Sequence, residues 1–197
     1  MPITISGDGT ITGISVGGLP DGIVDTDMLA TGAATGAKLG SGAIVQTVIG
    51  ANGEANTSSV AIGSSDVNNP TFLDSNCKVT ITPLFANSKI LLVWRAGIRL
   101  DPSGMGYFGV YYSPNSNMSS PVVLDKARGA SLNETYRNND SGGNSHIFLP
   151  DTGVTWDATV TNTNTRYYNV GAYEGSGNII YGDQQIALQL MAQEIKT

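Results

Sequence analysis

Strict alternation of apolar and polar residues is the dominant pattern in the second half of the chain. The longest example covers 88–100, and its first face is apolar throughout: Ile90, Leu92, Trp94, Ala96, Ile98 and Leu100. Its second face carries basic side chains beside two apolar ones: Lys89, Arg95, Arg99, Leu91 and Val93. A period of two over this length predicts a long, half-buried strand in an antiparallel sheet.

Shorter runs of the same kind, separated by Gly, Pro and Asn, predict further strands. These runs are 78–82, 106–112, 121–125, 154–160, 166–174, 178–181 and 184–195. The last run also has helical i, i+4 spacing at Ile186, Leu190 and Glu194, but its neighbours are all β, so we predict a strand. About eight strands with turns between them predict a mainly β domain, an antiparallel, jelly-roll-like β-sandwich over 46–197.

The first third of the chain differs because it lacks bulky side chains. Residues 1–71 contain no Phe, Trp or Tyr, and all 14 aromatic residues lie between Phe72 and Tyr181. Aromatic side chains supply much of the buried area of ordinary cores, so a Gly-, Ala-, Ser- and Thr-rich stretch without them is not expected to close a core alone. Two interpretations remain open: the stretch is disordered, or it becomes ordered by packing against other chains.

A ten-residue repeat favours packing against other chains. The repeat occurs three times and begins at Leu19, Leu29 and Leu39. Each unit consists of a Leu, any residue, an Asp, Thr or Ser, a Gly and two apolar residues. Such repeats mark units that bury surface only against neighbours. We predict an extended Gly/Ala-rich stalk over 19–45, in which these three leucines of parallel copies face a common trimer axis. A flexible linker is the alternative interpretation.

The first 18 residues form a third segment. Their apolar residues largely alternate with Ser, Thr or Gly: Ile3, Ile5, Ile11, Ile14 and Val16. This pattern predicts one or two short strands with a turn at 7–9. A strand with free edges suits docking onto another protein by strand addition, and a hairpin folded back onto the stalk fits equally well.

The composition excludes several classes of function. Charged residues make up 13 % of the chain, about half of the roughly 25 % typical of soluble domains. Ten basic residues and a net charge of −6 argue against nucleic-acid binding, which needs a clustered positive surface. No run approaches the ~18 consecutive apolar residues of a membrane span, so we expect no membrane insertion.

Nucleophilic chemistry finds little support in the sequence. His146 is the only histidine, and a triad with a neighbouring serine and Asp151 lacks a supporting motif. Cys77 is the only cysteine, which excludes an intrachain disulfide and a multi-cysteine zinc site. It stands just before a predicted strand, where we expect it to be a small buried hydrophobic side chain.

Acid–base and metal chemistry are as poorly supported. Two carboxylate pairs are close in sequence, Asp151 with Asp157 and Glu134 with Asp140, but neither sits in a glycosidase motif. Residues 138–144 offer oxygen ligands without the spacing of a calcium-binding loop, and we predict a mobile loop there. We therefore expect no enzymatic activity, no metal site and no cofactor.

Surface recognition is the chemistry that remains. Two predicted loops, 111–117 and 136–140, combine aromatic rings with amide or charged groups, a composition that suits the rings and hydroxyl groups of glycans. The candidate receptor contacts in these loops are Tyr111, Asn115, Asn117, Tyr136, Arg137, Asn138 and Asp140. Tyr111 and the adjacent Tyr112 suit a core or a subunit interface equally well.

Several stretches of the sequence resemble bacteriophage tail-fibre and virion proteins. Those similar to carboxy-terminal domains of this family are 79–93 (VTITPLFANSKILLV), 167–173 (YYNVGAY) and 186–195. Two others, 23–30 (IVDTDMLA) and 35–39 (TGAKL), resemble collar regions of phage fibres. The resemblance implies a homotrimeric jelly roll similar to complement-like and tumour-necrosis-factor-like heads, and a place in the virion.

The leading hypothesis is therefore a non-enzymatic phage virion protein, a short trimeric tail fibre or knob. In this hypothesis 1–18 dock onto other virion proteins, 19–45 form the stalk, and 46–197 form a head that contacts a glycan or protein receptor on the host surface. The alternatives are a capsid-bound decoration or fibre protein, a glycan-cleaving tail spike, and a cellular carbohydrate-binding module.

Overall fold

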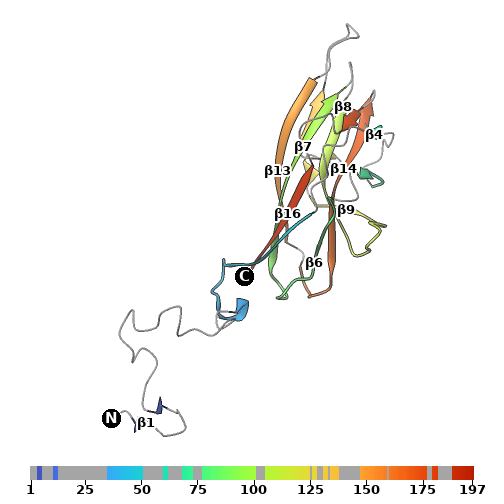
Figure 1. The fold of residues 1–197 in the computed structure, drawn as a ribbon. Helices are drawn as coiled ribbons and strands as arrows, with labels where there is room; N and C mark the ends of the chain where they lie inside the picture. Colours follow the sequence, from blue (N-terminus) through green and yellow to red (C-terminus); the bar gives the residue numbers. More distant parts are fainter. Residues whose placement is uncertain are drawn as a thin grey trace. The chain divides into compact units, whose positions relative to one another are not determined.

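The computed structural model (Figure 1) describes part of the 197 residues. The described residues are 4–5, 11–12, 35–50, 60–61, 68–72, 77–100, 105–124, 126–127, 131–132, 134–137, 147–158, 160–176, 179–181 and 188–197. They belong to two compact units, Met1–Leu39 and Gly40–Thr197, and each unit is described by itself. We call Gly40–Thr197 the β-unit.

The first unit contains one short strand pair and one helical turn among its described residues. β1 (Thr4–Ile5) pairs antiparallel with β2 (Ile11–Thr12), which confirms the strands predicted for the first 18 residues. η2 (Gly36–Lys38) is a single 3-10 turn that ends at Leu39, whose side chain is 38 % exposed. The two preceding leucines of the repeat lie outside the described residues.

The described residues of the β-unit form mainly two antiparallel sheets of six strands each, and antiparallel sheets are what the alternation predicted. The first, which we call the β7 sheet, is centred on β7 (Lys89–Leu100). One edge of β7 pairs with β13 (Ile147–Asp157), and the other pairs with β16 (Gln189–Ile195) and β15 (Ile179–Tyr181). The outer strands are β3 (Ile44–Ile49) on β16 and β4 (Val60–Ala61) on β15.

The second sheet, which we call the β8 sheet, is centred on two long strands. Its order is β12 (Glu134–Arg137), β8 (Met105–Ser113), β14 (Arg166–Ser176) and β5 (Thr71–Phe72). β6 (Val79–Ile81) also pairs with β14, and β9 (Val122–Val123) with β8. A separate pair consists of β10 (Lys126–Ala127) and β11 (Ser131–Leu132).

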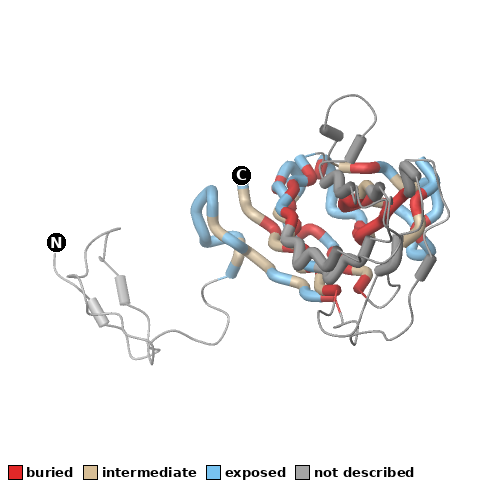
Figure 2. Tube along the Cα trace, turned by 90° about the horizontal axis from the view of Figure 1, so that it is seen from above, coloured by how far each residue is buried: buried red, intermediate tan, exposed pale blue. Residues whose placement is uncertain are grey.

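Both sheets contribute side chains to one apolar core. Its fully buried members include Val79, Ile81, Ile90, Leu92, Phe108, Val170, Leu188 and Leu190. The predicted inner face of β7 is confirmed at Ile90, Leu92 and Trp94, and Cys77 is buried as expected. Figure 2 shows how buried and exposed stretches alternate along the chain of the β-unit.

Strand β13 differs from its prediction at both ends. The sequence pattern predicted a strand over 154–160, whereas the observed strand is Ile147–Asp157. Pro150 and Gly153 resemble turn signals, but β13 pairs only with β7 among the described strands, and an edge strand tolerates proline. Gly153 lies opposite Trp94, and a Cβ there would clash with the indole ring.

The β-unit also begins earlier than the boundary predicted at 46. β3 pairs antiparallel with β16, and the residues before it continue this contact. The Gly42 amide donates to the Lys196 carbonyl at 2.7 Å, and the Lys196 amide donates to the Ala43 carbonyl at 3.0 Å. The run 184–195, which also permitted a helix, is strand at Gln189–Ile195.

At one end of the β7 sheet, three polar side chains stand in register with the core residue Ile90. The strand register places Asp157, Ile90, Glu194 and Gln46 side by side across β13, β7, β16 and β3. Glu194 is fully buried and Asp157 is 1 % exposed. Buried carboxylates need hydrogen-bond partners, because the loss of solvation is otherwise uncompensated.

Glu194 finds its partners in the turn that precedes β7. Its carboxylate accepts hydrogen bonds from the amides of Leu84 at 2.9 Å and Phe85 at 3.0 Å. The Gln46 side-chain amide donates a third bond to it at 2.5 Å. Glu194 therefore fastens the turn at 83–88 to β16 and β3.

We expect Glu194→Gln to lower the free energy of unfolding by about 1–3 kcal/mol, because an amide N–H group would face one of the N–H donors that now bind the carboxylate. Denaturant unfolding followed by tryptophan fluorescence measures the loss. The matched control is Gln193→Ala on the outer face of the same strand, which should stay within about 0.5 kcal/mol of the parent. Equal losses in the two variants would contradict the role assigned to Glu194.

Candidate functional site

The outer face of the β7 sheet carries a continuous row of apolar side chains. Ile49 lies opposite Met191, Met191 opposite Val93, and Val93 opposite Val154. Opposed residues of neighbouring strands point to the same side of a sheet. The row therefore crosses β3, β16, β7 and β13 without a polar interruption.

A second apolar pair lies beside this row. Leu91 of β7 is opposite Trp156 of β13, one alternation away from Val93 and Val154. We call these six side chains the apolar face: Ile49, Leu91, Val93, Val154, Trp156 and Met191. The sequence had placed Leu91 and Val93 on the outer side of β7, and the structure confirms this.

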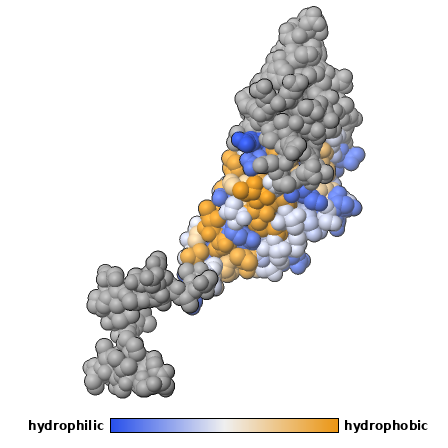
Figure 3. All heavy atoms as spheres, viewed as in Figure 1, coloured by the Kyte–Doolittle hydropathy of each residue, from blue (hydrophilic) through white to orange (hydrophobic). Residues whose placement is uncertain are grey.

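Much of the apolar face is open to solvent in the single chain. Ile49 is 55 %, Val154 58 % and Trp156 48 % exposed, while the other three side chains are half-buried. Figure 3 shows apolar atoms gathered over the part of the surface where Figure 1 draws β13 and β16. A contiguous patch of large apolar side chains marks an interaction surface more often than a free one.

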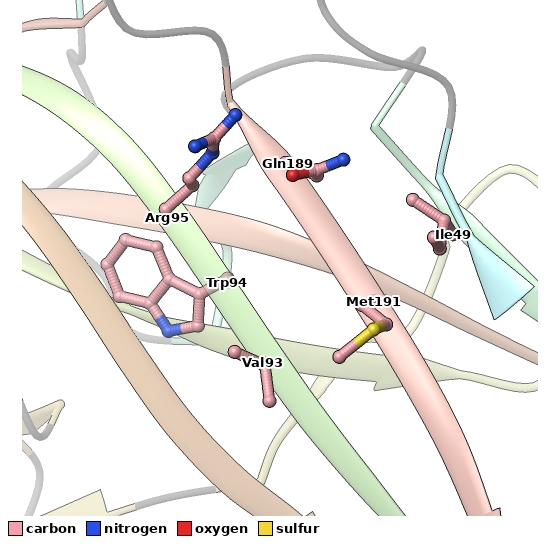
Figure 4. A pocket seen from close by; sticks show the side chains of 6 residues that line it. All are labelled: Ile49, Val93, Trp94, Arg95, Gln189 and Met191. Atoms are coloured by element: carbon pink, nitrogen blue, oxygen red, sulfur yellow. The ribbon is translucent and has the colours of Figure 1, made fainter. Parts of the chain in front are cut away.

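The apolar face contains a hollow of about 160 Å³. Its lining residues are Ile49, Val93, Trp94, Arg95, Gln189 and Met191. Figure 4 shows them on three neighbouring strands, with Arg95 and Gln189 together at one end and Met191 between Val93 and Ile49. The hollow thus has apolar walls and a polar rim, the usual arrangement of a protein-binding surface.

The apolar side chains of β13 face outward because the polar ones are needed inside. Asp157 is buried and forms an ion pair with Arg166, at 2.7 Å between Oδ2 and Nη1. The Tyr168 hydroxyl donates to the same carboxylate oxygen at 2.7 Å. Since side chains alternate along a strand, an inward Asp157 forces Val154 and Trp156 to the outside.

Aromatic rings enclose this buried ion pair. The Arg166 guanidinium lies over the Tyr112 ring, with Cζ 4.5 Å from the centroid, and the Tyr112 and Tyr168 rings are 5.8 Å apart. Burial raises the pKa of Tyr168 above its ordinary value of 10.0, and the negative charge of Asp157 raises it further. Asp157, Arg166 and Tyr168 join the β7 sheet to the β8 sheet.

The outer face of the β8 sheet differs because a loop covers it. Its aromatic side chains form a second cluster around Tyr111. The Tyr107 and Tyr173 rings stack at 4.6 Å, and the Phe72 ring meets Tyr111 edge-on at 5.9 Å. Residues 113–120 fold over this cluster and bury Met118.

Hydrogen bonds within the covering loop fix its shape. The Ser113 hydroxyl donates to the Ser119 carbonyl at 2.7 Å, and the Ser119 amide donates to Asn117 Oδ1 at 3.0 Å. The Lys78 ammonium donates to the Ser116 carbonyl at 2.5 Å, which ties the loop to the start of β6. These contacts rely on short-range side-chain bonds of Ser and Asn, which favour turns.

A second hollow, of about 220 Å³, lies between the covering loop and the β8 sheet. It is lined by Phe72, Lys78, Ser116, Asn117, Met118 and Asn169. An aromatic ring, amides and an ammonium group surround it, so it can make both apolar and hydrogen-bonded contacts with a polar ligand. We call it the loop hollow.

The predicted receptor contacts differ in their exposure to solvent, and some lie outside the described residues. Asn115 and Asn117 are exposed on the covering loop, whereas Tyr111 is fully buried, which favours the core role left open by the sequence. Tyr136 and Arg137 belong to β12, next to β8, and their side chains are outside the described residues. Asn138 and Asp140 also lie outside the described residues.

Of the six residues that line the loop hollow, only Asn117 was predicted as a contact from the sequence, and three of the others come from outside the covering loop. Phe72 reaches it because β5 pairs with β14, opposite Gly171, and Asn169 stands on β14 itself. Lys78 comes from the residue before β6. These contacts join segments that are far apart in the sequence, so a local sequence motif could not predict them.

The candidate catalytic carboxylates do not come together where the structure describes them. Asp151 and Asp157 lie on the same strand, and six residues of extended chain span about 20 Å. That separation exceeds the roughly 5–9.5 Å between glycosidase carboxylates. Within the described part of the chain no three His, Cys, Asp or Glu residues group as metal ligands, and no helix there is long and apolar enough to cross a membrane.

Comparison with known proteins does not assign a family. No protein-family model matches the chain, and no curated protein matches its sequence. The functional argument therefore rests on the residues and surfaces described above.

We expect Asp157→Ala to lower the free energy of unfolding by about 3–5 kcal/mol, because it leaves the Arg166 guanidinium buried without its carboxylate. Denaturant unfolding measures the loss. The matched control is the double variant Asp157→Val, Arg166→Met, which removes both charges and should recover part of that stability. A double variant whose loss equals the sum of the losses of Asp157→Val alone and Arg166→Met alone would contradict the pairing.

The raised pKa of Tyr168 predicts that the free energy of unfolding falls at alkaline pH. Its pKa is higher in the folded chain than in the unfolded chain, so the stability that it contributes is complete below pH 10 and falls as the pH rises above 10. Tyr168→Phe should therefore weaken the decline of stability at high pH. Denaturant midpoints between pH 8 and pH 12 measure this, and an unchanged decline in Tyr168→Phe would contradict it.

Proposed function

We propose that the chain is a non-enzymatic structural protein of a bacteriophage virion, a short homotrimeric tail fibre or knob that attaches to the host surface. In this proposal the β-unit is a jelly-roll-like sandwich at the end of a stalk formed by the repeat. The observation that carries the proposal is the apolar face. An exposed apolar surface favours binding to a partner, and the chain has few charged residues to keep it apart from other molecules.

The position of the apolar face in the chain supports association with copies of itself. β3 carries one end of the face and follows the repeat with only a few residues between Leu39 and Ile44. Any contact between copies through the repeat would hold their β3 strands at high effective concentration. Cyclic symmetry is the common solution for such assemblies.

Attachment to a host needs a surface that the assembly leaves open. The loop hollow lies on the β8 sheet, the sheet that does not carry the apolar face. Its amide, ammonium and aromatic groups suit a glycan or a polar segment of a receptor protein. Three copies on one particle component would raise the avidity of a weak site without new contacts.

The stretches that resemble phage fibres support a place in the virion. The paired strands β1 and β2 are the candidate contact with other virion proteins, through edges that pair with no other strand among the described residues. Antibody labelling of intact particles tests this placement. Label at the tail or portal vertex is expected, label spread over the shell would identify a capsid decoration, and unlabelled particles would overturn the proposal.

We expect the full chain to be a trimer in solution at micromolar concentration, and Leu29→Asp to weaken assembly by placing a charge at the predicted axis. Sedimentation velocity measures both masses. Thr31→Ser, a small change within the same repeat unit, is the matched control and should remain trimeric. A monomeric parent chain would refute the trimer, and a trimeric Leu29→Asp would place this side chain away from the axis.

A further inference from the structure

We propose that the loop hollow binds an acidic sugar, that is, a sugar ring that carries a carboxylate group. In this assignment Lys78 pairs with the carboxylate, Asn117 donates to a ring oxygen, and Phe72 packs against the apolar face of the ring. The inference rests on the proposed attachment to the host surface, and it names the class of glycan that the site recognises.

The lining of the loop hollow carries a positive charge. Lys78 is charged, and none of the six described residues that line the hollow is acidic. The Lys78 ammonium donates to the Ser116 carbonyl at 2.5 Å and lies 5.7 Å from the centroid of the Tyr167 ring, so its position is fixed. An ammonium group has three N–H donors, and the bond to Ser116 uses one of them. The hollow therefore offers an anion a charged group that is already in place.

The polar groups of the lining favour a ligand that accepts hydrogen bonds. Asn117 Oδ1 accepts from the Ser119 amide at 3.0 Å. Asn169 Oδ1 accepts from the Val170 amide at 2.8 Å. The exposed Asn117 side chain therefore presents its Nδ2 donors to a ligand beside the Lys78 ammonium. A carboxylate suits such a site best, because hydrogen bonds that involve charged groups are stronger than neutral ones.

The apolar part of the lining favours a ring over a small free anion. Phe72 and Met118 line the hollow beside the polar groups. The Phe72 ring meets the buried Tyr111 ring edge-on, which restricts its tilt and gives a ligand a fixed aromatic wall. The volume of about 220 Å³ lies below the ~300–1,000 Å³ of sites for drug-sized ligands, so the hollow holds one sugar ring of a longer glycan.

The covering loop holds this arrangement before a ligand binds. Met118 and Ser120 have φ angles of 58° and 53°, in the left-handed region that residues other than glycine seldom adopt. The Met118 amide donates to the Asn115 carbonyl at 2.9 Å, and the Asn115 amide donates to the Ser113 hydroxyl at 3.0 Å. Backbone strain of this kind is typical of ligand-binding sites. A loop that is fixed in advance loses little conformational entropy on binding.

NMR titration of the full chain with matched sugars tests the assignment. The acidic probes are methyl β-glucuronide and methyl β-galacturonide. Their neutral counterparts, methyl β-glucoside and methyl β-galactoside, carry a hydroxymethyl group in place of the carboxylate. We expect millimolar binding of at least one acidic probe and at least about tenfold weaker binding of its neutral counterpart. Binding of neither acidic probe, or equal binding of each acid and its counterpart, would overturn the inference.

Two variants test whether the loop hollow is the site. Lys78→Gln should abolish the preference for the acid and weaken its binding at least about tenfold, because a neutral amide replaces the ammonium. Asn117→Asp keeps an oxygen for the Ser119 amide but places a negative charge at the hollow, so it should also weaken binding of the acid. The matched control is Lys89→Gln, the same change at an exposed lysine of the β7 sheet, which should bind like the parent chain.

Thermal unfolding shows whether each variant is folded, and Asn117→Asp decides the question if Lys78→Gln is not. Binding of the acid that is unchanged in the folded variants would place the sugar elsewhere and overturn the inference. A short capped peptide with one glutamate that binds as tightly as the acidic sugar would show that the carboxylate alone is recognised, which overturns the assignment to a sugar.

The antibody labelling of intact particles separates this inference from the proposed function. Labelled tails together with no preference for acidic sugars would overturn the inference and leave the proposed attachment standing. Unlabelled particles would overturn the proposed function, while a preference for the acid that depends on Lys78 would still support the site.

Discussion

The buried ion pair between Asp157 and Arg166 decides which way β13 faces. Asp157 Oδ2 and Arg166 Nη1 are 2.7 Å apart, and the Tyr168 hydroxyl donates a hydrogen bond to the same Oδ2 atom. A slip of one residue in β13 would bring Trp156 into the core and leave Arg166 without its carboxylate. The cost of that buried charge is larger than the gain from burying one more apolar ring. The apolar face is therefore a consequence of electrostatics inside the core.

Two carboxylates close the same end of the β7 sheet in different ways. Asp157 and Glu194 flank Ile90 from opposite sides, one on β13 and one on β16. Asp157 is paired with a cation across to the β8 sheet, whereas Glu194 accepts two backbone amides and a side-chain amide. The first carboxylate joins the two sheets, and the second fixes the turn that begins β7. Together, Asp157 and Glu194 mark the end of the apolar core at this end of the β7 sheet.

Alternation made the central strands predictable, because β7 and β16 bury one apolar face. For β13 a strand was predicted from 154 onward, but its start and its orientation were not, because inward Thr155 and Asp157 are polar and outward Val154 and Trp156 are apolar, the reverse of the usual assignment. β3 escaped notice because Ile44, Val45, Val48 and Ile49 do not alternate. Of the loop hollow only Asn117 was foreseen, since Phe72 and Lys78 arrive through pairings over long sequence distances. Sequence patterns report local periodicity, and these features depend on tertiary contacts.

The pairing of β3 with β16 has a consequence for synthesis of the chain. Gln46 and Glu194, which meet in this pair, are 148 residues apart. At about 5–20 residues per second on a ribosome, β3 waits roughly 7–30 seconds for its partner strand. The repeat, which begins at Leu19, is synthesised before β3. Neighbouring ribosomes on one message would therefore have time to bring nascent chains together before any of them completes its sheet.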